Sequence, residues 1–284
     1  MRPGRAAARL HSARNPGRFR PARRAVAEEQ TEMALGEAAK LLARAGHVVV
    51  FTGAGISAES GVPTFRDALT GLWSRFDAQA LATPQAFAED PDLVWGWYEW
   101  RRRLVQRVRP NHGHLAVSRM AAHLPRLTVI TQNVDDLHER AGSPAPLHLH
   151  GSLFTPRCAS CSRPAPLPPP IPDDADAEGR RIPPPRCRHC TGPIRPGVVW
   201  FGEPLPEYAL ESAVRAASAC DVLLTIGTSG LVYPAAEIPR LAARAGAAVL
   251  QINPQPTPLD PIATVNLPGP AAEILPTLVD TTWP

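Results

Sequence analysis

Short apolar runs recur along the chain and alternate with longer stretches in which apolar residues repeat every three or four positions. The runs are almost free of polar residues, so each predicts a strand buried on both faces of a sheet. The expected strands are 48–51, 127–131, 222–226 and 248–252. The repeating stretches predict helices at 34–45, 93–105, 114–124, 209–219 and 235–245. This alternation predicts an α/β fold with a doubly wound parallel sheet.

The segment 155–196 interrupts the alternation, because it is rich in Pro and has too little apolar content for a core of its own. It holds two pairs of cysteines, Cys158-x-x-Cys161 and Cys187-x-x-Cys190. Four thiolates at this spacing complete a tetrahedral zinc site. Two disulfides or a redox-active pair are the alternatives. We expect one structural zinc ion and a small zinc-ribbon domain.

Positive charge is concentrated at the N-terminus. The formal net charge is +4, but residues 1–32 carry eight Arg against three Glu, and the remainder is almost neutral. This distribution argues against a nucleic-acid partner. The apolar runs are too short to cross a membrane, and the N-terminal Arg residues are not followed by the apolar stretch of a secretory signal. We therefore expect a cytoplasmic protein, with 1–32 as a disordered extension or a misplaced start and 33–284 as the folded part. The oligomeric state stays open, and a monomer is compatible with the sequence.

The loop after the first predicted strand has glycines where a dinucleotide-binding turn needs them. Gly53-Ala54-Gly55 would let the backbone approach a pyrophosphate, although a third glycine is missing and a simple tight turn is the alternative. The whole string 53–66, Gly-Ala-Gly-Ile-Ser-Ala-Glu-Ser-Gly-Val-Pro-Thr-Phe-Arg, resembles the signature loop of the sirtuins, the NAD-dependent protein deacylases. Further resembling blocks follow in order at 131–138, 148–151, the cysteine pairs, 198–203, 227–229 and 252–254.

The resemblance implies an architecture and a reaction. The NAD-binding, Rossmann-like domain would comprise 34–154 and 197–284, with a helical insertion at about 67–110, beside the zinc domain. Sirtuins act on acylated lysines of proteins. They break the bond between nicotinamide and ribose, the acyl oxygen attacks the ribose carbon, and the products are nicotinamide and O-acyl-ADP-ribose.

The resemblance also implies roles for single residues. His150 matches the catalytic base, and a histidine suits a base that works near neutral pH. Asn133 would contact the ribose and Asp135 the nicotinamide amide, although a turn that caps the next helix would also explain both. The implied cofactor-binding residues further include Gly53, Ala54, Gly55, Ser57, Phe65, Arg66, Gln132, Gly227, Thr228, Ser229, Asn253 and Ala271.

Tyr98 and Arg101 resemble the pair that marks the bacterial desuccinylase- and demalonylase-type sirtuins of class III. They are three residues apart on a predicted helix, so their side chains lie on one face. The carboxylate of a succinyl or malonyl group needs a partner in an apolar tunnel, and a guanidinium with a phenol would supply it. Ala82 would leave room for that group. The alternative is a solvated basic face formed by Arg101 and its neighbours, with Tyr98 packed beside a tryptophan.

Phe201, Gly202 and Glu203 resemble the edge with which sirtuins pair an extended substrate peptide. Backbone hydrogen bonds there would bind a peptide with little demand on its sequence. An ordinary end of a core strand is the alternative for Val198 and Val199, which precede these residues.

Two other functions remain open at this point. A mono-ADP-ribosyltransferase would start from the same cleavage of NAD and pass the ribose to another nucleophile. A non-enzymatic zinc ribbon that binds nucleic acid would use the cysteine pairs alone. The products formed from NAD and an acylated peptide distinguish the first from a deacylase, and a salt-dependent DNA affinity would indicate the second.

Overall fold

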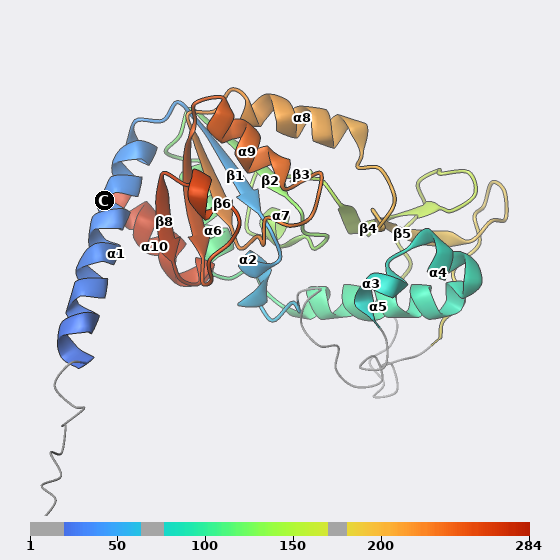
Figure 1. Cartoon of the computed structure of the whole chain (residues 1–284). Coiled ribbons are helices and arrows are strands. Elements are labelled where there is room, and N and C mark those ends of the chain that lie inside the picture. Colours follow the sequence, from blue (N-terminus) through green and yellow to red (C-terminus); the bar gives the residue numbers. More distant parts are fainter. Residues whose placement is uncertain (1–19, 64–76, 170–180) are drawn as a thin grey trace, which may run out of the picture.

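In the part of the chain that the structure describes, six parallel strands form one sheet. The structure is a computed structural model that describes residues 20–63, 77–169 and 181–284, with side chains of the first helix described from residue 29 onward. The strand order is β3-β2-β1-β6-β7-β8. Their bounds are β1 His47–Thr52, β2 Arg126–Thr131, β3 Leu147–His148, β6 Val222–Ile226, β7 Ala248–Asn253 and β8 Val265–Pro268. The predicted parallel sheet is confirmed (Figure 1).

Helices cover both faces of the sheet. One face carries α1 (Arg20–Ala43), α2 (Gly55–Ala58), α6 (His112–Met120) and α10 (Ala271–Thr282). The opposite face carries α8 (Glu207–Ala217) and α9 (Glu237–Arg244). Residues of β1 alternate between the two cores, with Val48 and Val50 in the first and Val49 and Phe51 in the second. Both sides of the strand are therefore buried, which explains its continuous apolar run.

A second, smaller unit lies beside the sheet (Figure 1). It combines the helices α3 (Ala78–Leu81), α4 (Pro84–Glu89) and α5 (Pro91–Arg107) with the antiparallel hairpin of β4 (Gly151–Cys158) and β5 (Ile194–Val198). One hydrophobic core joins these parts and includes Trp97, Leu153, Cys158, Cys187 and Trp200. The helical insertion therefore packs on the cysteine-containing hairpin, and the two form one body.

Element boundaries differ from the sequence pattern mainly at the N-terminus. The first helix starts at Arg20 rather than near residue 34, so residues 20–32 are helical in the structure. The hairpin of the small unit starts at Gly151, a few residues before the expected boundary at 155. Among the described residues, no helix is both long and apolar enough to span a membrane.

Candidate active site

The carboxyl ends of four neighbouring strands bring the candidate cofactor residues to one edge of the sheet. β1 is followed by Gly53–Ser57, β2 by Gln132–Asp135 and β6 by Gly227–Ser229, while β7 ends at Asn253. Chain order reverses between β1 and β6, which is the switch point where doubly wound sheets bind ligands. Four segments that are remote in sequence thus meet where this fold class places its ligand.

Glycines allow two of these loops to touch through their backbones. The N–H of Gly55 donates to the carbonyl of Gly227 at 2.8 Å. A Cβ on Gly55 would lie 2.6 Å from the Cα of Gly227, which itself has φ +58°. Both positions therefore require glycine for packing alone. Around this crossing, Gln132 Nε2 donates to Thr228 Oγ1 at 2.9 Å and Asn253 Nδ2 donates to the Thr228 carbonyl at 2.7 Å.

A buried polar cluster lies between the first two loops. Ser57 Oγ donates to Asp135 Oδ2 at 3.0 Å and accepts from Asn133 Nδ2 at 3.0 Å. Burial raises the pKa of Asp135, although the N–H of Leu137 and the Ser57 hydroxyl donate to the carboxylate and oppose the shift. The sequence-predicted Ser57, Asn133 and Asp135 are therefore one hydrogen-bonded unit.

His114 also joins this cluster, although no sequence motif pointed to it. Its Nε2 lies 3.4 Å from Ser57 Oγ, and its ring contacts that of His138 with centroids 5.0 Å apart. Burial lowers the pKa of His114 to about 4 and that of His138 to about 3, so both rings are neutral near pH 7. Only the fold could identify His114, because it comes from α6, far from the sirtuin-like blocks.

His150 lies where β3 passes into β4, and its ring has a defined tautomer. Nδ1 lies 2.9 Å from the carbonyl oxygen of Gln132, which can only accept, so Nδ1 carries the proton. The lone pair is left on Nε2. Burial lowers the pKa of His150, opposed by that same hydrogen bond, and keeps the ring neutral. A neutral imidazole with a free Nε2 lone pair is the form a general base requires.

Tyr98 and Arg101 are brought together on α5, as their spacing predicted. The Tyr98 ring is buried, and its hydroxyl accepts from Trp200 Nε1 at 3.1 Å. The Arg101 guanidinium lies over the rings of Trp97 and Tyr98, at 5.2 and 6.0 Å from their centroids. Burial raises the pKa of Tyr98 to about 12, so the phenol stays protonated. Ala82 is also buried and accepts at its carbonyl from the N–H of Phe201 at 2.9 Å.

The alternative of a solvated basic face is wrong for this helix. Arg102 and Arg103 are both buried, and Arg102 forms an ion pair with the buried Glu99. Arg102 also donates to the carbonyl of Pro168 at 3.2 Å, which ties α5 to the segment after the first cysteine pair. That alternative also placed Tyr98 beside a tryptophan, and this part is confirmed. The ring centroids of Tyr98 and Trp97 lie 4.6 Å apart.

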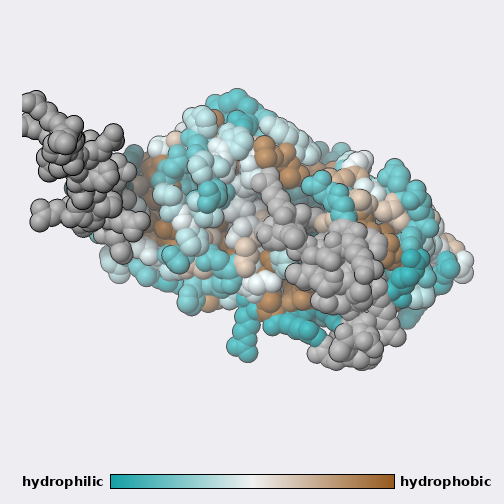
Figure 2. Space-filling view, turned by 60° about the horizontal axis from the view of Figure 1, so that its bottom comes forward, coloured by the Kyte–Doolittle hydropathy of each residue, from teal (hydrophilic) through white to brown (hydrophobic). Residues whose placement is uncertain are grey.

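The block 201–203 forms a turn after β5. Phe201 and Gly202 are exposed, and Gly202 has φ +86°. The Glu203 carboxylate accepts from Arg195 Nη2 at 2.8 Å and from the Trp200 N–H at 2.9 Å. Glu203 therefore holds the turn, and this accounts for its presence without a substrate contact. Figure 2 shows one face of the molecule, on which hydrophobic residues lie in several separate patches among hydrophilic ones.

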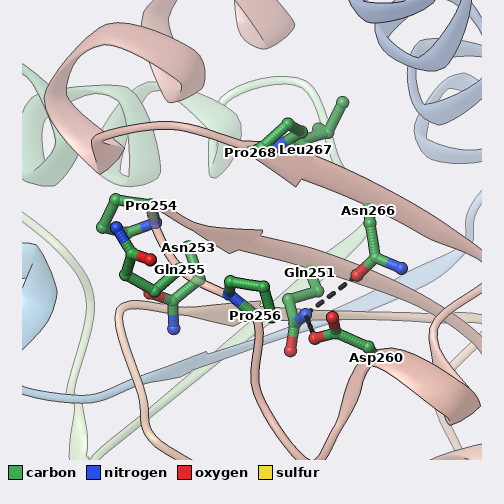
Figure 3. A pocket seen from close by; sticks show the side chains of 9 residues that line it. All are labelled: Gln251, Asn253, Pro254, Gln255, Pro256, Asp260, Asn266, Leu267 and Pro268. Carbon is green, nitrogen blue, oxygen red and sulfur yellow. Dashed lines mark hydrogen bonds between the residues drawn. The ribbon is translucent and has the colours of Figure 1, made fainter.

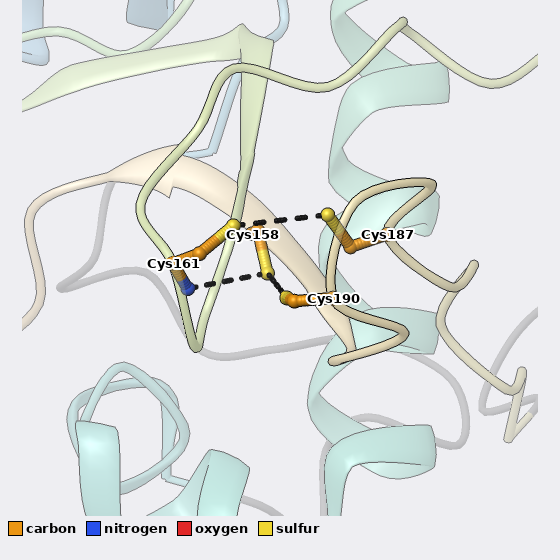
Figure 4. Close-up of side chains that lie close together, drawn as sticks. All are labelled: Cys158, Cys161, Cys187 and Cys190. Atoms are coloured by element: carbon orange, nitrogen blue, oxygen red, sulfur yellow. Dashed lines mark hydrogen bonds between the residues drawn. The ribbon is translucent and has the colours of Figure 1, made fainter.

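The four predicted zinc ligands converge from two loops (Figure 4). Their sulfur atoms all lie within 4.8 Å of one another, with Cys158 and Cys190 at 3.4 Å and Cys161 and Cys187 at 3.8 Å. A tetrahedral zinc ion with Zn–S bonds of about 2.3 Å separates its sulfur ligands by about 3.8 Å. The thiols are free, so the disulfide alternative is wrong. The backbone N–H groups of Cys161 and Ser160 lower the pKa of Cys158 to about 6, which favours the thiolate. The chain has a tetra-cysteine zinc site.

A small pocket opens beside Asn253, at the carboxyl ends of β7 and β8 (Figure 3). Its volume is about 80 Å³, which is below the range that accommodates a whole cofactor. Gln251 Nε2 donates to Asn266 Oδ1 at 2.8 Å across it, and Asp260 accepts from the same amide. This pocket is therefore too small to hold a whole cofactor by itself.

The remaining candidates are less informative. Ala271 is buried at the start of α10, and its backbone carbonyl lies against Gly113, where a Cβ would be 3.2 Å away. Ala54 and Ser229 lie at the sheet edge with the other loop residues. Phe65 and Arg66 lie outside the described residues.

Comparisons with known proteins agree with this geometry. Residues 53–234 match the Sir2 family. An NAD-dependent protein deacylase from Methylococcus capsulatus is 59% identical over 235 residues, which are 83% of this chain and 92% of the relative. The crystal structure of a Sir2 homologue–NAD complex superimposes with a TM-score of 0.77 at 45% identity, covering 87% of this chain and 93% of that chain. A mutant Sir2 homologue in complex with 2'-O-acetyl ADP ribose gives a TM-score of 0.77 at 44% identity, covering 87% and 95%. On its sheet topology, its cysteine cluster and these similarities, this chain belongs to the Sir2 family, the sirtuins.

Proposed function

We propose that this chain, an NAD-dependent protein deacylase, removes acidic acyl groups such as succinyl and malonyl from protein lysines in addition to acetyl groups. The observation that carries the acidic-acyl specificity is the placement of Tyr98 and Arg101 side by side on α5. Burial lowers the pKa of Arg101, and the charge of Asp135, a member of the buried cluster, acts in the opposite direction. This influence supports our proposal that the guanidinium faces the end of the acyl-lysine near the nicotinamide site.

The hydrogen bond from Trp200 supports a donor role for Tyr98. Because the phenol oxygen already accepts from the indole N–H, the hydroxyl has its own proton to donate elsewhere. The raised pKa of Tyr98 keeps that proton in place. A guanidinium and a phenol donor, both in apolar surroundings, match a carboxylate. An acetyl group has no carboxylate to use them.

Further residues would serve binding and proton transfer. NAD, when bound, supplies the ribose carbon that receives the acyl oxygen, with nicotinamide as the leaving group. Asn133, Asp135 and Ser57 would bind the nicotinamide side. His150 would act through Nε2 as the base that accepts the proton of a ribose hydroxyl, because Nδ1 is fixed by the Gln132 carbonyl.

The remaining cofactor contacts that we propose come from the loops at the sheet edge, and Phe65 and Arg66 stay predictions from the sequence. The proposed cofactor-binding residues at the edge are Gly53, Ala54, Gly55, Gln132, Gly227, Thr228, Ser229, Asn253 and Ala271. The zinc ion has no free ligand position in a four-cysteine site, so its role would be structural.

The protein substrate would bind at the exposed turn formed by Phe201, Gly202 and Glu203. An extended peptide could pair with this backbone while the acyl-lysine enters between the sheet and the small unit. Four unlinked thiols in one cluster are typical of a reducing compartment, which supports the cytoplasm as the location.

Mass spectrometry of the products tests this function. The protein is incubated with NAD and with peptides that carry acetyl-, succinyl- or malonyl-lysine, and nicotinamide, O-acyl-ADP-ribose and deacylated peptide are measured. We expect all three products in equal amounts. ADP-ribosylated protein without O-acyl-ADP-ribose would instead indicate a mono-ADP-ribosyltransferase.

Arg101→Met tests the acyl specificity. Leaving a buried carboxylate without its cationic partner costs about 3–5 kcal/mol, so desuccinylation should fall more than about a hundredfold. Deacetylation should change little. Arg107→Met, an exposed change on the same helix, is the matched control. If both activities fall together in Arg101→Met, or if succinyl-lysine is never a substrate, the acidic-acyl assignment is wrong.

A further inference from the structure

The loop that carries Asn133 and Asp135 is held by two histidines, one on the edge strand β3 and one in the turn that follows it. The edge strand β3 contains only Leu147 and His148, and its ladder with β2 ends where the loop begins. Beyond that point, His150 Nδ1 lies 2.9 Å from the Gln132 carbonyl and His148 Nδ1 lies 3.0 Å from the Asn133 carbonyl. Histidine side chains therefore hold two successive carbonyls of this loop.

The rings of His148 and His150 differ in the group that lies next to Nε2, the second ring nitrogen. Nε2 of His148 lies 2.7 Å from Glu139 Oε1 on α7 (Leu137–Arg140), so both ring nitrogens of His148 face oxygens that only accept. A neutral imidazole has one N–H and cannot donate to both. The imidazolium can donate to both at once. His148 is therefore charged, whereas His150, in the turn that follows the strand, is neutral.

The surroundings of His148 agree with this charge. Hydrogen bonding and charge from Glu139, together with the Asn133 carbonyl and Asp135, raise the pKa of His148, although burial acts in the opposite direction. His138, also on α7, is neutral because burial lowers its pKa to about 3. α8 also packs near β3, but it turns Ala209 and Ala213 inward. Its charged residues are exposed: Glu207, Glu211 and Arg215.

We propose that His148 and Glu139 form a proton-dependent clamp that positions Asn133 and Asp135 for the deacylation reaction. When His148 loses its proton, one of its nitrogens must turn a lone pair toward an oxygen. If that nitrogen is Nδ1, the Asn133 carbonyl is repelled, and the peptide that leads from Asn133 toward Asp135 is released. Asn133 and Asp135 both bond to Ser57, so a shift of this peptide disturbs the whole buried cluster.

The clamp predicts the direction of the pH dependence. Because the pKa of His148 is raised, the contact is present below that pKa and is lost as pH rises through it in the folded protein. His150 acts in the opposite direction, because a base with a lowered pKa is lost only as pH falls. Activity should therefore decline on the alkaline side for a reason unconnected with the base.

The variant Glu139→Gln distinguishes a proton-dependent clamp from a contact between His148 and residue 139 that is only structural. The introduced amide can donate to Nε2 of a neutral His148, which then keeps its Nδ1 proton on the Asn133 carbonyl without needing a charge. Glu237→Gln is the matched control, because Glu237 is also paired, with Arg244, and its side chain is 44% exposed against 43% for Glu139. Both variants lose one acidic charge from a helix.

The experiment measures kcat/KM with an acetyl-lysine peptide, the release of nicotinamide across the pH range, and the titration of His148 by NMR. We expect the activity of the wild type and of Glu237→Gln to decline at alkaline pH, and Glu139→Gln to lose this decline, because its neutral His148 keeps the Nδ1 proton on the Asn133 carbonyl. By NMR, His148 should titrate above the usual histidine range in the wild type and about one unit lower in Glu139→Gln. His148→Asn keeps one amide donor for the Asn133 carbonyl without a titrating group, and it should lose the decline as well. An alkaline decline that is the same in Glu139→Gln and the wild type, or a His148 that is neutral at pH 7, would overturn the clamp.

Discussion

The hydrogen bond between Trp200 and Tyr98 predicts that an indole outside the acyl pocket sets acyl specificity. The perturbation is Trp200→Phe, which keeps an aromatic ring against Phe87, now at 5.3 Å between centroids, and removes only the N–H and part of the ring volume. The Tyr98 oxygen is buried, so without the indole it needs another donor. The Arg101 guanidinium, 6.0 Å from the centroid of the Tyr98 ring, is a charged donor on the same helix, and it would be drawn away from the acyl carboxylate.

The size of the effect follows from the kind of hydrogen bond that is lost. A hydrogen bond to a charged group contributes about 1.5–3 kcal/mol, so Tyr98→Phe should lower the ratio of desuccinylation to deacetylation roughly 10- to 150-fold. Loss of the neutral bond from the indole costs about 1 kcal/mol, or roughly fivefold in the same ratio. The loss of ring volume in Trp200→Phe should lower desuccinylation and deacetylation alike, so it cancels in their ratio.

The assay is kcat/KM for succinyl- and acetyl-lysine versions of one peptide, measured in a double-mutant cycle. If Trp200 acts through Tyr98, adding Trp200→Phe to Tyr98→Phe should change the ratio no further. The reasoning fails if the ratio in Trp200→Phe equals that of the wild type. It fails also if the two substitutions are additive, since Trp200 would then act on the substrate by another route.

Two further predictions concern the base and the zinc ion. His150→Ala should lower deacylation by a factor of about 100 or more while zinc content and melting temperature stay close to wild type, because the base lies outside the zinc site; near-normal turnover would remove His150 from this role. Cys187→Ala should lose zinc, measured by atomic emission, and lower the melting temperature, since Cys187 is part of the core shared with α5. Equal melting temperatures with and without a strong chelator would contradict a structural zinc ion.

The sheet and the zinc site could be predicted because their signals are local. A strand buried on both faces has no polar positions, and the pattern located β1, β2, β6 and β7 to within a residue or two of their ends. Cysteine pairs at two-residue spacing indicate a metal whatever the surrounding fold, and the sulfur positions confirm it. The edge strand β3 is too short to leave a pattern, and it was not predicted.

What the sequence could not supply is contact between distant segments. The burial of Arg102 depends on Glu99 and on the Pro168 carbonyl, and without those partners a run of three arginines reads as solvated surface. His148 and His150 look alike in sequence, yet their charge states differ because one faces Glu139 and the other does not. Pairing of this kind is set by tertiary structure.

The two units of the fold each contribute half of the proposed site, and His150 lies at their junction. The sheet fixes its ring through the Gln132 carbonyl. The hairpin of the zinc-binding unit fixes its backbone, because the His150 carbonyl accepts from the Val199 N–H at 2.8 Å. The next residue, Gly151, has φ +71°, and a Cβ there would lie 2.1 Å from the Gly197 carbonyl oxygen, so the hairpin can close only over glycine. Closure of the zinc-supported hairpin therefore determines where His150, the proposed base, lies relative to the sheet edge. Through this connection a structural zinc ion would affect the proposed chemistry without any contact with substrate.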